Sequence, residues 1–314
     1  MTSRDSAPPP LRPRALRPGS RVALVAPAGP LQPGVLDKAL ERCRKLDLEP
    51  IVYPAATRRR GYLAGSDDER LADLQAAFDD PANDAVWALR GGYGTLRILD
   101  GLDLARQRRA PIPFIGFSDN TNLHALHARA GVISFHGPHP GADFPLETEA
   151  SFRAALFSGE ASGRLPSRPD DPAPHRLVGG SARGRLIGGN LAILASLCGS
   201  RDAILARGRI LFLEDVGEPA YRVDRMLHQL LRAGAFDGVA GLAFGRFTGV
   251  REGAGHMAAV LAELAVRLGV PAVAGLPFGH TDHNCTIPVL ANARLDADSA
   301  TLTVTESATR TGRA

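Results

Sequence analysis

A single serine, Ser118, lies where the sequence changes from one structural pattern to another. Residues 113–117 are mostly apolar and predict a short strand, whereas the residues after Ser118 predict a helix that continues through His127. Gly116 allows a tight turn, and the three polar residues after Ser118 are types that start helices. A hydroxyl at this corner would project close to the free N–H groups of the helix. The Gly-x-Ser-x-Asn pattern is typical of a nucleophile elbow, although a serine that only caps the helix would give the same pattern.

A nucleophilic serine needs a base that takes its proton and an acid that orients the base. Glu214 ends the apolar run 211–213, and an acid at that position either faces solvent or has a buried partner. His280 lies in a loop that Pro277 and Gly279 constrain. The chain order Ser, Glu, His occurs in known triads. Taken alone, however, each of the two residues is equally well explained as a surface group without a role in chemistry.

A glycine-rich turn over residues 90–94 (Arg-Gly-Gly-Tyr-Gly) follows another predicted strand. Its backbone N–H groups could hold a phosphate, but the turn lacks both the GxGxxG spacing and a Walker lysine. The same groups could face an oxyanion beside Ser118. A third interpretation is a turn that needs glycine only for its backbone conformation.

Histidine pairs offer a different chemistry, based on zinc. The pairs are His124 with His127, His136 with His139, and His280 with His283. No HExxH motif accompanies them, and no carboxylate stands at ligand spacing beside the helical pair, so we expect neither a metal nor another cofactor. Cys285 is a weak candidate nucleophile because no helix start is present to lower its pKa.

Composition favours a globular protein with two domains. The 314 residues are 44% hydrophobic and 22% charged, and the formal net charge is +4. Arginines are scattered rather than interleaved with aromatic residues, which argues against a nucleic-acid partner. No apolar run is long enough to span a membrane, and residues 1–20 lack the apolar core of a secretory signal. The three cysteines form no CxxC pair and suit a reducing cytoplasm.

Strand and helix patterns alternate along the chain and predict an α/β fold with a parallel sheet. Predicted strands cover residues 21–26, 51–53, 85–89, 114–117, 210–215, 239–244, 286–290 and 301–305. Predicted helices cover residues 34–45, 70–78, 95–99, 191–198, 221–233 and 256–268. The turns after Val25, Leu89 and Phe117 would then meet at the carboxyl edge of the sheet, where ligands bind.

Two boundaries divide the chain. Residues 1–20 are rich in Pro and Arg and predict a disordered lead-in, and residues 162–182 are rich in Pro without apolar periodicity and predict a linker. We therefore expect an N-terminal domain over 21–161, a C-terminal domain over 183–306, and a disordered tail over 307–314.

Six short stretches together resemble the LD-carboxypeptidases, cytoplasmic serine peptidases that trim murein tetrapeptides. They are 25–29 (Val-Ala-Pro-Ala-Gly), 90–94, 116–119 (Gly-Phe-Ser-Asp), 188–191 (Gly-Gly-Asn-Leu), 213–218 (Leu-Glu-Asp-Val-Gly-Glu) with 221–225 (Tyr-Arg-Val-Asp-Arg), and 278–280 (Phe-Gly-His). They follow the family order over residues 21–304, which is nearly the whole chain.

The resemblance implies a catalytic triad in which Ser118 is the nucleophile, His280 the general base and then acid, and Glu214 the group that orients His280. It implies an oxyanion hole made of the backbone N–H groups of Asp119 and Gly92. It also implies a flavodoxin-like N-terminal domain, a smaller β-rich C-terminal α/β domain, a homodimer, and a site in the cleft between the two domains.

The expected reaction releases terminal D-Ala from a murein tetrapeptide or related small peptide. A free carboxylate calls for a guanidinium; the candidates are Arg90, Arg222, Arg225 and Arg246. The rival hypothesis within the family is a microcin-immunity-type peptidase acting on a peptidyl-nucleotide, although the single tryptophan, Trp87, falls in a predicted buried strand. Two hypotheses from different functional classes are a non-catalytic module that binds carboxylates or glycans, and a zinc hydrolase.

One position departs from the family pattern. The family commonly has glycine two residues after the proline of the closing strand, where this chain has Leu290. Leu290 follows the His280 loop, and we therefore expect it to alter the wall of the substrate pocket.

Overall fold

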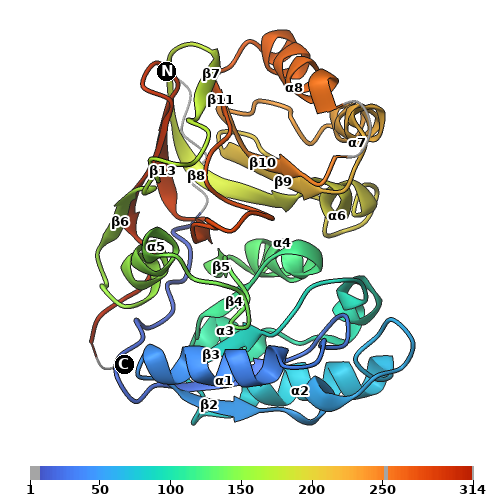
Figure 1. The fold of residues 1–314 in the computed structure, drawn as a ribbon, viewed down its shortest axis with the longest axis vertical. Coiled ribbons are helices and arrows are strands. Elements are labelled where there is room, and N and C mark those ends of the chain that lie inside the picture. The colour runs from blue at the N-terminus through green and yellow to red at the C-terminus, as the bar shows by residue number, and fades with distance from the viewer. Residues whose placement is uncertain (1–7, 251–253, 313–314) are drawn as a thin grey trace.

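The structure is a computed structural model that describes residues 8–250 and 254–312. Two α/β lobes lie one above the other in Figure 1, with the first half of the chain (blue to green) below and most of the second half (yellow to red) above. Each lobe is built on its own sheet. This arrangement confirms the prediction of two α/β units.

Six strands of the described chain form the N-terminal sheet. In spatial order they are β2 (Glu49–Val52), β1 (Arg21–Val25), β3 (Ala85–Ala88), β4 (Phe114–Gly116), β5 (Ser134–His136) and β12 (Ile287–Val289). The first five run parallel in the order 2-1-3-4-5, which is the flavodoxin-like order. The predicted fold of this domain is therefore confirmed.

Helices cover both faces of this sheet. They are α1 (Val35–Lys45), α2 (Asp67–Asp79), α3 (Ala105–Arg109), α4 (Thr121–Ala130) and α5 (Leu146–Leu156), with short 3-10 helices η1 (Pro54–Thr57), η2 (Thr95–Gly101) and η3 (Ser118–Asn120). Alternate residues of a strand point to opposite faces of the sheet. In β3, Trp87 packs in a cluster with α1 and α5, whereas Val86 packs in a cluster with α2 and α4. Such burial on both faces explains the nearly continuous apolar runs of these strands.

Eight described strands form the C-terminal sheet. Their order is β6 (Ala161–Arg164), β14 (Thr301–Ser307), β13 (Asn292–Asp296), β8 (Ser181–Asn190), β9 (Ile210–Val216), β10 (Gly241–Thr248), β11 (Ala272–Ala274) and β7 (His175–Val178). The central strands β8 to β11 are parallel, and the outer ones are antiparallel.

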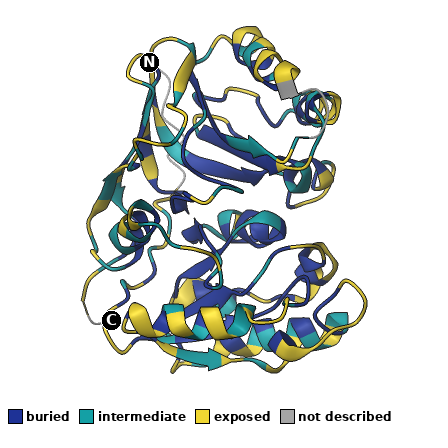
Figure 2. Cartoon of the chain, in the orientation of Figure 1, coloured by how far each residue is buried: buried dark blue, intermediate teal, exposed yellow. Residues whose placement is uncertain are grey.

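Three helices pack on one face of this second sheet: α6 (Leu191–Ser196), α7 (Ala220–Arg232) and α8 (Ala254–Leu268). Figure 2 shows that the central strands of both sheets are buried, whereas α1 and α8 each present an exposed side. Within the described ranges, no helix is both long and apolar enough to cross a membrane.

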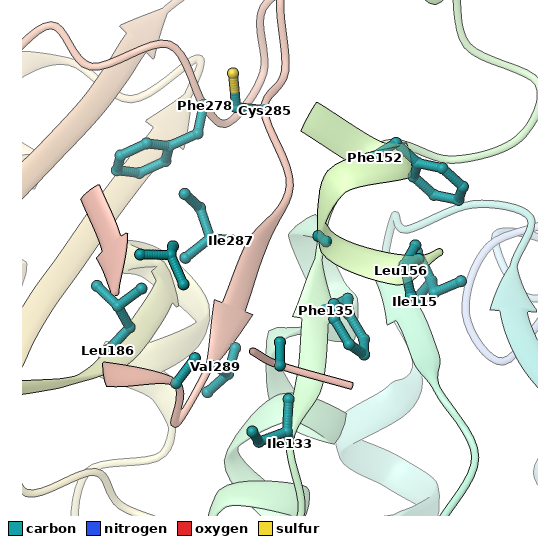
Figure 3. Packing of buried hydrophobic residues seen from close by; sticks show 14 of the residues in the cluster. Ile115, Ile133, Phe135, Phe152, Leu156, Leu186, Phe278, Cys285, Ile287 and Val289 are labelled. Carbon is teal, nitrogen blue, oxygen red and sulfur yellow. The ribbon is translucent and has the colours of Figure 1, made fainter. Parts of the chain in front are cut away.

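Strand β12 joins the two lobes. It belongs by sequence to the second half of the chain, yet it pairs antiparallel with β5 at the edge of the N-terminal sheet. Figure 3 shows Ile287 and Val289 of β12 between Phe135 of β5 and Leu186 of β8. One apolar cluster therefore runs from the first sheet to the second, and the lobes share a core.

Both predicted disordered ends need correction. Residues 8–20 pack along the body of the chain: Leu16 is buried, its N–H donates to the carbonyl of Leu156, and Leu11 bridges to Val132. The tail is held in the same way at Thr309, which is buried. The apolar side chains among the prolines of the lead-in are what anchor it. Residues 1–7 and 313–314 of the two predicted segments lie outside the described residues.

The predicted linker 162–182 also needs correction. It contributes β6 and β7, which close opposite edges of the C-terminal sheet by pairing with β14 and β11. These edge strands are held by backbone hydrogen bonds and carry few apolar side chains. The sequence therefore shows no alternation of apolar and polar residues that would predict them. The predicted helix at 95–99 is the 3-10 helix η2.

Candidate active site

Ser118 occupies a strained corner between β4 and α4. Its φ is +62°, in the left-handed region that residues with a side chain rarely adopt. A side chain at Gly116 would come within 3.1 Å of the side chain of Asn120, so glycine gives the close turn more room there. This strand, turn and helix geometry is the elbow that the sequence predicted, and the strained backbone presents the hydroxyl beyond the strand end.

The glycine-rich turn lies directly against this corner. A Cβ atom placed on Gly91 would lie 2.9 Å from Ser118 Oγ and 3.2 Å from the backbone nitrogen of Asp119. Gly92 follows with a φ of +105° and lies against Gly29. The turns after β1, β3 and β4 therefore meet at the carboxyl edge of the sheet, as predicted. The lack of a side chain at Gly91 lets the glycine-rich turn approach Ser118 this closely.

The side chain of Asp119 fastens this turn to the elbow. It is buried, and its Oδ2 accepts hydrogen bonds from the backbone N–H and the hydroxyl of Thr95, each at 2.8 Å. Burial raises the pKa of Asp119 despite these hydrogen bonds. Asn120 adds a second tie, since its side-chain amide donates to the carbonyls of Phe117 and Arg90. The backbone N–H of Asp119 stays beside Gly91.

A histidine and a carboxylate of the C-terminal lobe form a close pair. Glu214, at the end of β9, accepts a hydrogen bond at Oε2 from His280 Nδ1 at 2.7 Å. The same oxygen accepts from the backbone N–H of His280 at 3.2 Å. Gly279 allows this approach, because a Cβ atom there would lie 2.6 Å from Glu214 Oε2. The neighbouring Asp215 points to the opposite face of β9 and bonds Asn190 and the start of α6 instead.

The electrostatics of this pair favour an ionised carboxylate and a basic imidazole. Burial would raise the pKa of Glu214, which is completely inaccessible, but the rings of His136 and His280 outweigh burial and hold its pKa at about 2. Burial would lower the pKa of His280, but the hydrogen bond and the charge of Glu214 raise it above its usual value. Glu214 can therefore fix the ring and stabilise its protonated form.

The pair lies next to the elbow. The ring of His280 contacts that of Phe117, the residue before Ser118, with centroids 4.8 Å apart. Phe117 also contacts His139, in the loop after β5, at 4.4 Å. Among the described residues, no hydrogen bond joins Ser118 to His280. Catalytic hydrogen bonds are often long before substrate binds, so the geometry brings the two groups to one place without yet linking them.

The glycines at 188 and 189 dock the two lobes beside the elbow. A side chain on Gly189 would lie 2.6 Å from the side chain of Thr121, at the start of α4. Asn190 then donates its backbone N–H to Thr121 Oγ1 at 3.0 Å. This contact sets the end of β8, and with it the adjacent end of β9, beside the start of α4, three residues after Ser118.

The four candidate arginines lie in different surroundings. Arg90 follows β3, donates to the carbonyl of Pro30, and is close to His139 beside the elbow. Arg246 lines a cavity of about 310 Å³ and donates to the carbonyl of Pro172. Arg222 is exposed and paired with Glu218. Arg225, also on α7, lies over the ring of Tyr221.

The histidine pairs do not assemble a metal site: among residues 8–250 and 254–312, no group of three or more His, Cys, Asp or Glu is placed to hold an ion. His124 and His127 are buried and bond neighbouring backbone and Ser134. His136, which the sequence suggested only as a ligand, instead lies 3.7 Å from Glu214. Its position at the end of the mostly apolar run 132–135 was the one signal that could have placed it here.

Sequence comparison agrees with this geometry. Residues 22–137 match the LD-carboxypeptidase N-terminal domain, and residues 183–295 match the LD-carboxypeptidase C-terminal domain. A murein tetrapeptide carboxypeptidase of Pseudomonas aeruginosa is 37% identical over 310 residues, covering 95% of this chain and 99% of that protein. The chain belongs to the LD-carboxypeptidase family. Family membership makes it a peptidase, and the resemblance seen in the sequence is confirmed.

Solved structures share the fold of this chain. The muramoyltetrapeptide carboxypeptidase of Oxalobacter formigenes superposes with a TM-score of 0.80 at 31% identity, covering 93% of this chain and all of that one. The microcin C7 self-immunity protein MccF, in complex with aspartyl sulfamoyl adenosine, superposes with a TM-score of 0.85 at 23% identity, covering 96% and 100%. At that identity the second likeness shows the fold alone.

The structure gives a physical reason for the glycine that was expected at position 290. Leu290 has a φ of +74°, a conformation in which glycine is unstrained. Its side chain is buried in the core shared by the two lobes, and its N–H donates to the carbonyl of Leu186 at 2.7 Å. Leu290 therefore packs between the lobes, and the expectation that it alters the wall of the substrate pocket stays a prediction.

Proposed function

We propose that this LD-carboxypeptidase is a serine peptidase that cleaves an L-to-D peptide bond and releases terminal D-Ala from a murein tetrapeptide. The observation that carries the proposal is the Glu214–His280 pair, held 2.7 Å apart with the His280 ring against Phe117, directly beside Ser118. The relatives named for murein peptides support the substrate class.

In the proposed reaction, Ser118 Oγ attacks the carbonyl carbon of the L-configured residue while His280 Nε2 takes the hydroxyl proton. Glu214 holds the opposite ring nitrogen of His280 and stabilises the imidazolium that forms. The tetrahedral oxyanion accepts hydrogen bonds from the backbone N–H groups of Asp119 and Gly92. His280 then gives its proton to the amine of D-Ala, which leaves.

The remaining acyl-enzyme is an ester on Ser118. Water attacks its carbonyl carbon while His280 takes a proton from the water, and the returning proton restores the Ser118 hydroxyl. The products are a tripeptide with a new carboxylate and free D-Ala. These steps use only groups of this chain, the substrate and water.

The free carboxylate of the substrate requires a cation within reach of the cleft. Arg90 is our first candidate because it lies next to the elbow, and Arg246 is the second because it lines a cavity. Arg222 and Arg225 already contact neighbours on or beside α7. Replacing the correct arginine by Gln should raise KM much more than it lowers kcat, and kinetics of all four variants would identify it.

The decisive experiment is mass spectrometry of products from a tetrapeptide that ends in D-Ala and from its counterpart that ends in L-Ala. We expect tripeptide and free D-Ala from the first substrate only, and no product from the Ser118→Ala variant. Equal cleavage of both substrates, or turnover by Ser118→Ala near the wild-type rate, would contradict the proposal.

A second candidate function is hydrolysis of a peptidyl-nucleotide, and the likeness in fold to MccF favours it. The single tryptophan offers no surface for stacking a base: Trp87 is completely buried, stacks on Phe152 and donates to the carbonyl of Pro138. Assaying an aminoacyl sulfamoyl adenosine beside the murein tetrapeptide would separate the two functions.

We also propose a cytoplasmic homodimer, as the family resemblance implies. Sedimentation equilibrium should give twice the chain mass of 33.1 kDa. A single-chain mass at micromolar concentration would contradict the dimer, and fractionation of cells would test the compartment.

A further inference from the structure

The second oxygen of Glu214 faces a histidine that the proposed reaction does not use. Glu214 Oε1 lies 3.7 Å from Nε2 of His136. Both side chains are completely inaccessible to solvent. Within the described residues, neither that oxygen nor either ring nitrogen of His136 has a hydrogen-bond partner. Two unpaired buried polar groups that face each other, about 0.5 Å beyond hydrogen-bond reach, are an unusual arrangement.

The two groups come from different lobes. His136 ends β5 of the N-terminal sheet, whereas Glu214 lies near the end of β9 of the C-terminal sheet. The His136 ring is held edge-on between Phe117, at 5.9 Å, and Phe212, at 5.5 Å. These aromatic contacts fix the ring so that its Nε2 faces the carboxylate. A small approach of the lobes would close the remaining gap.

We propose that His136 is a positioning residue that holds Glu214 in the reacting enzyme, with Nε2–H of His136 donating a hydrogen bond to Glu214 Oε1. This inference rests on the proposed function, because it assigns a second partner to the orienting carboxylate. Each oxygen of Glu214 then has its own imidazole: Oε2 bonds His280, and Oε1 bonds His136. With both oxygens bonded, the plane of the carboxylate is fixed, and so is the direction in which His280 presents Nε2.

This arrangement ties the two lobes together at the site. Ser118 and His136 belong to one lobe, and Glu214 and His280 to the other, so a His136–Glu214 bond also fixes the base relative to Ser118. The titratable groups that face His136 are Glu214 on β9, His124 on α4 and His139 in the loop after β5. His124 is already bonded to Ser134 and to the carbonyl of Gly116, so Glu214 is the acceptor left for His136.

The test compares His136→Phe, which removes the donor, with His136→Gln, whose amide can place a donor at nearly the same point. We expect His136→Phe to lose about 10–100-fold in kcat/KM, as is usual for partners that orient a reacting group, with most of the loss in kcat. His136→Gln should recover most of that loss. His127→Phe is the matched control: His127 is equally buried, but it bonds Leu123 and packs on Phe114, away from Glu214.

The pH profile distinguishes positioning from a general loss of stability. Without His136, more negative charge remains on the Glu214 oxygen that faces His280, which should raise the pKa of His280. The acid limb of kcat/KM should therefore move to higher pH in His136→Phe and stay in place in His127→Phe. A His136→Phe enzyme with kcat/KM within twofold of wild type and an unchanged acid limb would overturn the inference.

A second measurement covers the case in which His136→Phe does not fold. Proton NMR of the wild-type chain and of Glu214→Gln observes the Nε2–H resonance of the His136 ring directly, and we expect that resonance further downfield in the wild type, where the proton is donated to a carboxylate. The same resonance position in both would overturn the inference. The Ser118→Ala variant separates the two proposals: turnover by Ser118→Ala overturns the triad alone, since the NMR measurement of the His136–Glu214 contact needs no catalysis.

Discussion

Two histidines three residues apart, His280 and His283, each bond a carboxylate, and the two pairs differ in solvent access and in the residues beside them. His280 bonds Glu214 at 2.7 Å, and His283 bonds Asp171 at 2.6 Å, both through Nδ1. The free nitrogen of His283 lies 3.3 Å from Cys285 Sγ, so this second pair also has a candidate nucleophile at hand. By geometry alone, Asp171, His283 and Cys285 look more like a finished triad than the set with Ser118 does.

Access and charge separate the two sets. The side chain of His280 is 19% exposed and lies beside an open, strained corner, whereas that of His283 is inaccessible and Cys285 is buried. Burial raises the pKa of Cys285 to about 12, so its thiol stays protonated and unreactive near neutral pH. Hydrogen-bond geometry is therefore not sufficient for chemistry; the nucleophile must also be reachable and activated. The second set instead ties the segment before β7 to the loop that carries His280.

The largest expected difference between the two sets comes from removing the candidate nucleophile of each, Ser118 or Cys285. Ser118→Ala should lose about 10,000-fold or more in kcat/KM, because the attacking atom is gone. Cys285→Ala should keep kcat/KM within about threefold and lose roughly 1–2 kcal/mol of unfolding free energy, because it only removes a buried sulfur. Steady-state kinetics and urea unfolding measure both effects. A large loss of activity in Cys285→Ala, with stability retained, would reverse the assignment.

The carboxylates provide a second pair of variants. Glu214→Gln should lower kcat by about 1,000- to 10,000-fold, since the ring of His280 loses its orienting charge. Asp171→Ala should lower the free energy of unfolding by about 1–3 kcal/mol, because Nδ1 of His283 is left buried without its acceptor, and change kcat only a few-fold. Comparable losses of kcat in both variants would show that the two pairs act together.

The pH dependence should follow the accessible pair. His280 must be neutral to accept a proton, and its pKa is raised, so kcat/KM should rise with pH through a midpoint above 6.5. Glu214→Gln should move that midpoint down, whereas Asp171→Asn should leave it in place. The raised pKa of His280 also adds stability below pH 6.5 that is lost as pH rises through its folded value. A pH–rate profile of the three enzymes tests the prediction.

The mildest test is alkylation of the native chain. Cys285 and Cys43 are buried and their pKa values are raised to about 12, so iodoacetamide should not modify them before unfolding. Cys198 is only partly buried and should react slowly. Peptide mapping by mass spectrometry gives the modified positions. Rapid labelling of native Cys285 would show that the second set opens to solvent.

Much of the N-terminal lobe could be predicted from the sequence because its strands and helices are marked by patterns of residues that are neighbours in the chain. Fully buried parallel strands read as apolar runs, and helices α1 and α2 alternate with them, so β1, β3 and β4 were predicted nearly at their observed bounds. The elbow at Ser118 was visible for the same reason: strand, glycine, serine and helix-starting residues are neighbours in the chain. The β-strands at 161–164 and 175–178 were not visible, because edge strands depend on partners far away in the sequence.

Contacts between residues of different lobes could not be predicted from sequence patterns. Glu214 and His280 were proposed as partners chiefly because of the family resemblance, since 66 residues separate them. His136 and His283 were noticed only as candidate zinc ligands, whereas the structure gives each of them a carboxylate neighbour instead. Type and spacing show which residues can do chemistry, but the acid that each histidine meets is decided by how the sheets pack.

Strand β12 determines how the chain can be cut. A fragment that stops before residue 162 would keep Ser118 but would leave the outer edge of β5 without its antiparallel partner. An open strand edge promotes self-association. The complementary fragment would expose Ile287 and Val289 to water. Separately expressed halves should therefore aggregate, whereas co-expressed halves should assemble, because β12 from one half completes the sheet of the other and brings His280 beside Phe117.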